Sequence, residues 1–197
     1  GITSTSDLTE KGLDNAISAA YEASNFGNPN EIPQFSSLAK AELPLIKRPM
    51  IDPLGIKHLF KLLCDAEKQL INSHKSIKSV PYNGLSESIY ERIYFNSDGA
   101  KREIKRTQSS IYLYARSLEN GKKPRSSGSL RIANGVNELD IKGCIDEASM
   151  KTISHLDYAP IETGKYLVCF KPDAFLDLIG AFSNIFNARS IIDGISL

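Results

Sequence analysis

The side chains that could bind a metal ion or move protons are few in this sequence, and they are scattered. The three histidines are His58, His74 and His155, and no two are three or four residues apart, so no helix turn can present a pair to one ion. The common motifs of zinc peptidases, serine hydrolases, P-loop proteins and dinucleotide-binding proteins are also absent. We therefore predict no catalytic and no metal-binding residue in this chain, and the sequence leaves the substrate-binding residues unknown.

Cysteine chemistry is the next possibility, and the spacing argues against it. The sequence contains three cysteines, Cys64, Cys144 and Cys169, which are widely spaced. No two of them form a Cys-x-x-Cys pair, which excludes zinc-knuckle and thioredoxin-like motifs. Each lies among apolar neighbours, and a nucleophilic cysteine needs a nearby base in an electropositive setting. We expect buried, reduced thiols and a cytoplasmic location.

Two acidic groupings have structural explanations. Asp146 and Glu147 lie early in a predicted helix, where the helix dipole favours negative charge. Asp157 follows His155 by two residues, and side chains two apart do not share a helix face. We interpret both groupings as solvated or structural rather than as acid–base pairs.

The basic residues allow two interpretations. Lys101-Arg102, Lys105-Arg106 and the run from Lys122 to Arg125 flank two tyrosines, Tyr112 and Tyr114, and basic strands with aromatic residues can bind single-stranded nucleic acid. The same residues suit the solvent face of a sheet, where charged side chains prevent aggregation. Because Asp98, Glu103 and Glu119 dilute the positive charge, we favour the second interpretation and expect no nucleic-acid partner.

The composition is that of an ordinary globular protein. The chain has 197 residues, a net charge of +1 and 41% hydrophobic residues. No apolar run approaches the roughly 20 residues that span a bilayer, so we expect no membrane association. The sequence lacks an initiator methionine and ends abruptly, and we expect it to be a piece of a longer protein.

Hydrophobic periodicity predicts four helices. The first runs from Thr9, as N-cap, to Ser24; the second starts at Asp52-Pro53 and ends near His74; the third covers Ile141 to Leu156; the fourth starts at Pro172-Asp173. Asn25 to Pro49 contains Pro29, Pro33 and Pro44 and reads as a long irregular connection.

Alternating patterns predict strands between these helices. The expected strands are Ser79–Tyr82, Ser86–Tyr94, Arg102–Arg116, Ser127–Ala133 and Gly164–Phe170, with turns at Asn96–Gly99 and Glu119–Gly121. In the long third strand, Ile111, Leu113 and Ala115 alternate with the tyrosines. Because strands and helices are segregated, the sequence favours an α+β fold, an antiparallel β-meander with flanking helices.

Three passages together resemble one known family. They are Asn96-Ser97-Asp98-Gly99; Thr3 to Leu8 followed by an alanine-rich helix; and Tyr166 to Phe170 with Pro172-Asp173-Ala174 and the passage Ser190 to Leu197. In order and spacing they are similar to the TldD/PmbA family, once called modulators of DNA gyrase. The similarity spans nearly the whole chain.

The resemblance implies a family with two branches. The TldD branch carries a histidine-glutamate-x-x-x-histidine motif that binds zinc, whereas the PmbA (TldE) branch lacks it and pairs with a TldD subunit to process unfolded peptides. The motif positions fall at about Gly180, Ala181 and Ile185 of this chain, none of which can bind zinc. The chain therefore resembles the non-catalytic PmbA branch, with zinc expected only in a TldD-type partner, and with Phe182 and Ile185 packing in a core.

The resemblance also implies domains and partners. Residues 1–165 would be a partial N-terminal α+β domain, and residues 166–197 the start of a C-terminal half. The expected partners are a TldD-type metallopeptidase subunit or a second copy of the chain, and an unfolded peptide substrate that adds to a strand edge between about Tyr94 and Arg116. The alternative is a regulatory binding module such as a modulator of DNA gyrase; a peptidase acting alone is disfavoured because the ligands are missing.

Overall fold

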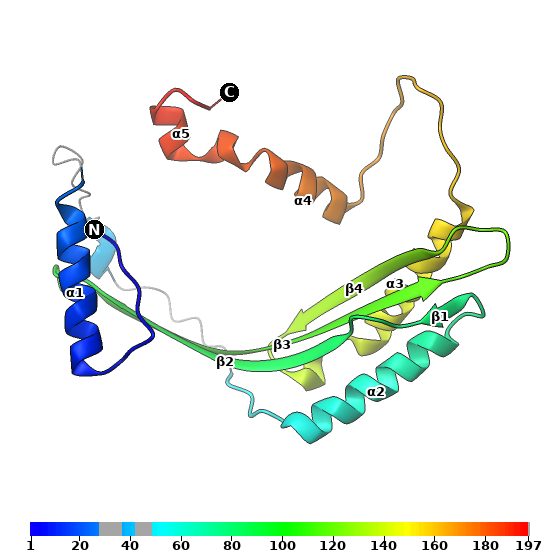
Figure 1. Cartoon of the computed structure of the whole chain (residues 1–197), viewed down its shortest axis with the longest axis horizontal. Coiled ribbons are helices and arrows are strands. Elements are labelled where there is room, and N and C mark those ends of the chain that lie inside the picture. The colour runs from blue at the N-terminus through cyan, green and yellow to red at the C-terminus, as the bar shows by residue number, and fades with distance from the viewer. Residues whose placement is uncertain (28–36, 42–48, 197) are drawn as a thin grey trace. The chain divides into compact units, whose positions relative to one another are not determined.

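An antiparallel sheet with helices on one face organises most of the chain (Figure 1). The computed structural model describes residues 1–27, 37–41 and 49–196. The helices are α1 (Glu10–Ser24), α2 (Ile56–Asn72), α3 (Ile141–Ser154), α4 (Pro172–Ala181) and α5 (Ala188–Ile192), and the strands are β1 (Ile77–Ser79), β2 (Gly84–Phe95), β3 (Lys101–Ser117) and β4 (Arg125–Ala133). The predicted α+β class with an antiparallel meander is therefore confirmed. Most of the predicted connection Asn25–Pro49, including Pro29, Pro33 and Pro44, lies outside the described residues.

The central strand of the sheet is β3. It pairs with β2 from Lys101↔Phe95 to Tyr112↔Gly84, and with β4 from Ser109↔Ala133 to Ser117↔Arg125. Strand β1 pairs with the end of β3 at Arg116 and Ser117. Successive side chains of a strand point to opposite faces, and in β3 the residues Ile111, Leu113 and Ala115 are buried, as the alternating sequence predicts.

The turn between β2 and β3 fixes this register. Gly99 has a φ of +82°, a left-handed conformation that glycine adopts without strain. The Ala100 N–H donates to Asn96 Oδ1 at 2.9 Å, and the Asn96 N–H donates to the Ala100 carbonyl at 3.1 Å. The predicted Asn96–Gly99 turn is thus present, and it sets which residue of β2 faces which residue of β3.

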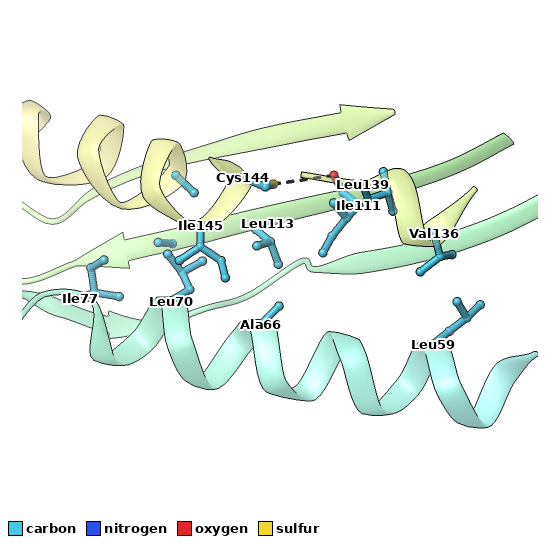
Figure 2. Packing of buried hydrophobic residues seen from close by; sticks show 12 residues of the cluster. Leu59, Ala66, Leu70, Ile77, Ile111, Leu113, Val136, Leu139, Cys144 and Ile145 are labelled. Atoms are coloured by element: carbon cyan, nitrogen blue, oxygen red, sulfur yellow. Dashed lines mark hydrogen bonds between the residues drawn. The ribbon is translucent and has the colours of Figure 1, made fainter. Parts of the chain in front are cut away.

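The hydrophobic core lies between one face of the sheet and helices α2 and α3 (Figure 2). Leu70 of α2, Leu113 of β3 and Cys144 of α3 are fully buried in it. The Cys144 thiol also lies 3.9 Å from the Ile111 carbonyl oxygen, a weak contact that links helix to sheet. The second and third predicted helices thus each bury side chains against the sheet, whereas Ile56 and Phe60 of α2 are exposed.

The start of α2 differs from the prediction. The helix begins at Ile56 and not at Asp52-Pro53, and its N-cap is Gly55, whose φ of +83° breaks the helical path. The Leu54 N–H donates to the Glu87 carboxylate, at 3.0 and 3.1 Å from its two oxygens, which holds the preceding segment against β2. By contrast, Thr9 caps α1 as predicted, because its hydroxyl accepts the Gly12 N–H at 3.2 Å.

The chain divides into two units, Gly1–Leu156 and Asp157–Leu197, while the predicted division between residues 165 and 166 stays a prediction. In the second unit no described side chain is buried. The strand predicted over Gly164–Phe170 is not formed, since the described residues offer it no partner strand. Cys169 is exposed and Phe182 is half exposed, so the predictions of a buried thiol and a core phenylalanine are wrong for these two residues.

Within the described residues, no helix combines the length and the apolar character that crossing a bilayer requires.

Candidate functional site

The three positions of the expected metal motif lie at the end of α4 and beyond it. Gly180 and Ala181 are the last two residues of α4, and Ile185 lies in the 3-10 turn Ser183–Phe186 that follows. A Cβ built on Gly180 would meet no atom within 4 Å, so this position faces open space. None of the three side chains carries a nitrogen, oxygen or sulfur ligand, and a zinc site does not fit them.

The other candidate ligands are not gathered elsewhere in the described chain. His58 lies exposed in the first turn of α2, and His155 is exposed at the end of α3. His74 follows α2 and accepts the Ser76 N–H through Nδ1 at 3.1 Å. Among the residues that the structure describes, no three histidine, cysteine, aspartate or glutamate side chains form a group that could hold a metal ion.

Glu147 of the acidic pair anchors α3 to β4. Its Oε2 accepts from the Ser129 hydroxyl at 2.7 Å and pairs with Arg131 Nη1 at 2.6 Å, and its Oε1 pairs with Lys151 at 2.6 Å. The hydrogen bonds from Lys151, Ser129 and Arg131 lower the pKa of Glu147 from 4.5 to about 2. All of its carboxylate bonds go to helix and sheet, which agrees with a structural role.

The predicted peptide-binding edge is partly wrong. Residues Ser109 to Tyr112 of β3 pair with both β2 and β4, so this part of the expected edge lies inside the sheet. Among the described strands, β2 and β4 each pair with β3 alone. Among the described strands, edges on which an extended chain could pair are therefore left by β1, β2 and β4, and by residues 101–108 of β3, which pair with β2 alone.

The two faces of the sheet differ in charge. The face turned away from α2 and α3, called here the open face, carries the even-numbered residues of β2, β3 and β4. Its charged residues are all arginines: Arg92, Arg102, Arg106 and Arg116. The strand glutamates Glu87, Glu91 and Glu103 have odd numbers and point to the opposite face.

This separation corrects the sequence-based view that acidic residues dilute the basic ones only for Glu103, since Glu119 does pair with Lys122, at 3.1 Å. Glu103 is next to Arg102 in the chain, but their side chains leave opposite faces of β3. The aromatic residues follow the arginines: Tyr112 and Tyr114 stack with ring centroids 6.2 Å apart, and Arg106 lies 5.1 Å from the centre of the Tyr90 ring. The sequence analysis did not assign Tyr90, Arg92 and Tyr94 to a surface shared with the basic residues of β3. The alternation of β2 and the position of the Asn96–Gly99 turn were the sequence signals that place them on the open face.

A cavity of about 410 Å³ opens beside Arg106, where β4 ends. Its lining is formed by Pro49, Arg106, Thr107, Gln108, Ile132, Ala133, Asn134 and Glu138. Thr107 Oγ1 lies 3.2 Å from Asn134 Oδ1, and the Asn134 side chain donates to the Pro49 carbonyl at 2.7 Å, which fixes this wall. The buried Nε of Arg106 has no hydrogen-bond partner in the described part of the chain.

Solved structures show the same fold. A crystal structure described as a candidate modulator of DNA gyrase from Bacteroides thetaiotaomicron superimposes with a TM-score of 0.78 at 16% identity, over 95% of this chain and 44% of that one. A similarly described protein from Thermotoga maritima gives 0.60 at 17% identity, over 82% and 36%. TldE from Thermococcus kodakarensis gives 0.51 at 18% identity, over 76% and 34%. The chain thus spans less than half the length of each of these proteins.

The sequence itself matches a family model. The match is to the PmbA/TldA metallopeptidase central domain and covers residues 50–156, which is more than half of the chain. No curated protein matches the sequence significantly. The matched range contains the whole sheet, α2 and α3, together with the open face and all of the cavity lining except Pro49. This chain therefore belongs to the PmbA/TldA metallopeptidase family.

Proposed function

We propose that this chain is part of a non-catalytic, PmbA/TldE-type subunit of a TldD/TldE-like metallopeptidase complex that takes part in proteolysis and peptide maturation. One observation carries the proposal: the positions of the metal motif hold Gly180, Ala181 and Ile185, which have no atom that binds zinc or transfers a proton. This chain would then hold no cofactor, and zinc would belong to a TldD-type partner. There its chemistry is the activation of a water molecule for attack on a peptide bond.

The contribution of this chain would be to hold the substrate. Extended peptides bind to proteins by pairing with a free sheet edge, where backbone hydrogen bonds give affinity and side-chain pockets give specificity. The outer edge of β2 supports such a role, since β2 pairs only with β3 among the described strands. The unpaired thiols Cys64, Cys144 and Cys169 agree with a reducing compartment, and we propose the cytoplasm.

The test is a zinc and activity measurement on the full-length polypeptide that contains this sequence. It is purified alone and together with a paralogue that carries the histidine-glutamate-x-x-x-histidine motif. We expect the two chains to co-purify, to contain about one zinc ion per motif-bearing chain, and to cleave an unfolded neutral peptide only as a complex. Replacing the glutamate of the partner's motif by glutamine is expected to abolish cleavage without separating the chains.

The result that contradicts the proposal is stoichiometric zinc bound by the full-length chain alone. A Cys169→Ser variant serves as a control, because Cys169 is exposed and a surface thiol can bind zinc adventitiously. Failure to co-purify, combined with salt-dependent binding to DNA, would instead favour the regulatory alternative.

A further inference from the structure

Strand β4 covers only part of one edge of β3 (Figure 1). It ends at Ala133, opposite Ser109, whereas β3 begins at Lys101. Residues 101–108 of β3, called here the single-paired segment, pair with β2 and with no other described strand. Backbone groups on such an edge can pair with an added strand. Because a two-stranded ribbon is only marginally stable in water, a third strand at this place would stabilise it.

The cavity of about 410 Å³ lies where β4 gives way to the single-paired segment, since Ala133 and residues 106–108 all line it. The 3-10 turn Val136–Glu138 follows β4 and closes the cavity on one side. Buried Val136 and Leu139 anchor both ends of this turn in the core. An added strand that continues the line of β4 would therefore start within a cavity whose wall is fixed.

Two opposite charges line this cavity without pairing with each other. The Arg106 guanidinium packs over the Tyr90 ring at 5.1 Å from its centre, and its buried Nε has no hydrogen-bond partner in the described part of the chain. The Glu138 carboxylate is exposed, and it forms no ion pair with any described residue. A matching ligand would bring a cationic donor for Glu138 and a hydrogen-bond acceptor for Arg106.

The amino terminus of a peptide combines these two groups. Its ammonium donates hydrogen bonds, and the carbonyl oxygen of the same first residue accepts them. A carboxyl terminus would instead bring a negative charge close to Glu138, and an internal peptide segment would bring no backbone charge at all. The pair of charges in the cavity therefore favours a free amino terminus over the other parts of a peptide.

The direction of pairing agrees with this choice. Strand β4 is antiparallel to β3 and ends at the cavity, so a peptide that continues β4 in the same direction has its amino terminus there. A peptide in the opposite direction would place its carboxyl terminus beside Glu138. It would also pair parallel to β3, which is slightly less stable per residue than antiparallel pairing.

We propose that the cavity binds the free amino terminus of an extended peptide, which pairs antiparallel with the single-paired segment of β3. Glu138 accepts hydrogen bonds from the ammonium, and Arg106 Nε donates to the carbonyl oxygen of the first peptide residue. This inference rests on the proposed role of the chain in holding peptides, and it adds which end of the peptide is recognised.

The test measures peptide binding by fluorescence anisotropy with the full-length polypeptide that contains this sequence, without its partner. The probe is an unstructured neutral peptide of about eight residues, labelled with fluorescein on a side chain near its carboxyl end. It is compared with the same peptide acetylated at its amino terminus and with one amidated at its carboxyl terminus. We expect acetylation, which removes the ammonium, to weaken binding about fivefold, and amidation to change the affinity by less than about twofold.

The decisive variant is Glu138→Gln, which removes the charge that would face the ammonium. It should weaken binding of the free-amine peptide about fivefold and leave the acetylated peptide unchanged. The matched control Glu22→Gln removes the same charge from an exposed position of α1 and should change neither. Arg106→Lys keeps the positive charge but loses the Nε donor, and it should weaken both peptides alike. Far-UV circular dichroism checks the fold of each variant, and the comparison of the free and acetylated peptides needs no variant.

A photo-crosslinker locates the bound peptide. A benzophenone side chain at the second residue of the free-amine peptide should label residues 132–138 or 104–108, as mapped by mass spectrometry after digestion. Labelling confined to β2 would place the peptide on the other edge of the ribbon.

Three results would overturn the inference: equal affinity for the free and acetylated peptides, equal effects of Glu138→Gln and Glu22→Gln on the free-amine peptide, or crosslinks confined to β2. Each would leave the proposed function intact, because a peptide could be held at another edge of the sheet. Loss of the proposed function would appear separately, as failure to co-purify with the partner or as zinc bound by this chain alone.

Discussion

Replacing Glu147 by glutamine tests how α3 is fastened to the sheet. The variant keeps the size of the side chain and much of its hydrogen bonding, and it removes the negative charge that faces Arg131 and Lys151. Because Glu147 joins β4 to α3 next to the buried core, its loss should lower the free energy of unfolding of the whole Gly1–Leu156 unit.

The pKa of Glu147 sets the size of the effect. A fall from 4.5 to about 2 corresponds to at most about 3.4 kcal/mol of stabilisation. The carboxylate side chain is 23% exposed, and solvent screens its partners, so we expect about 1–2 kcal/mol. The hydrogen bond with Glu147 also raises the pKa of Arg131, as expected when each charged group stabilises the other.

The pH dependence has a definite sign. The folded protein lowers the pKa of Glu147, so the stabilisation is fully present above pH 4.5 and is lost as the pH falls toward about 2. The wild-type chain and Glu147→Gln should therefore differ at pH 7 and converge at low pH.

Urea unfolding followed by circular dichroism, repeated at several pH values from 7 down to 2.5, measures this difference. The matched control is Asp146→Asn, since the Asp146–Lys142 pair lies one residue away and is largely exposed, and it should change stability by less than about 0.5 kcal/mol. The reasoning is refuted if both variants behave alike, or if the Glu147→Gln deficit is as large at pH 2.5 as at pH 7.

Two further predictions concern the core and the cysteines. Leu113→Ala should lower the free energy of unfolding by about 3 kcal/mol, because the Leu113 side chain is fully buried. Leu130 is half exposed on the open face, so Leu130→Ala should lower it by less than about 1 kcal/mol. Denaturant titration measures both losses, and equal losses would contradict the described core. Burial raises the pKa of the Cys144 thiol, whereas Cys169 is exposed. A thiol reagent should therefore label Cys169 in the folded protein and Cys144 only after unfolding. Mass spectrometry measures the labelling of each site, and rapid labelling of Cys144 in the folded protein would contradict the fold.

Where the sequence carries its own local determinants, it predicted the structure well. The alternation around Leu113 identifies the buried face of β3, and the Asn96–Gly99 segment encodes its turn through one side-chain acceptor and one glycine. These features depend on residues close in the chain, so they can be read without knowing the tertiary contacts.

The errors arise where contacts between residues distant in the sequence determine the local structure. Asp52-Pro53 resembles a helix start, but the helix begins only at Ile56. The hydrogen bond from the Leu54 N–H to the Glu87 carboxylate and the left-handed conformation of Gly55 keep the preceding residues out of the helix. The apolar segment Gly164–Phe170 has strand character, yet a strand forms only with a partner, and the described chain provides none. The arginine-bearing open face was missed for a similar reason, since Arg102 and Glu103 are neighbours in the sequence but leave opposite faces of the sheet.

One consequence concerns the uneven support along β3. Around Leu113 the strand is backed by helices, while near its first residues the ribbon leaves Ile93, Phe95 and Ile104 largely in water. Amide groups near the tip should therefore open at a much lower free energy than those beside the core. We therefore expect the ribbon to open from its turn, and to close again, while the part of the sheet around Leu113 stays folded.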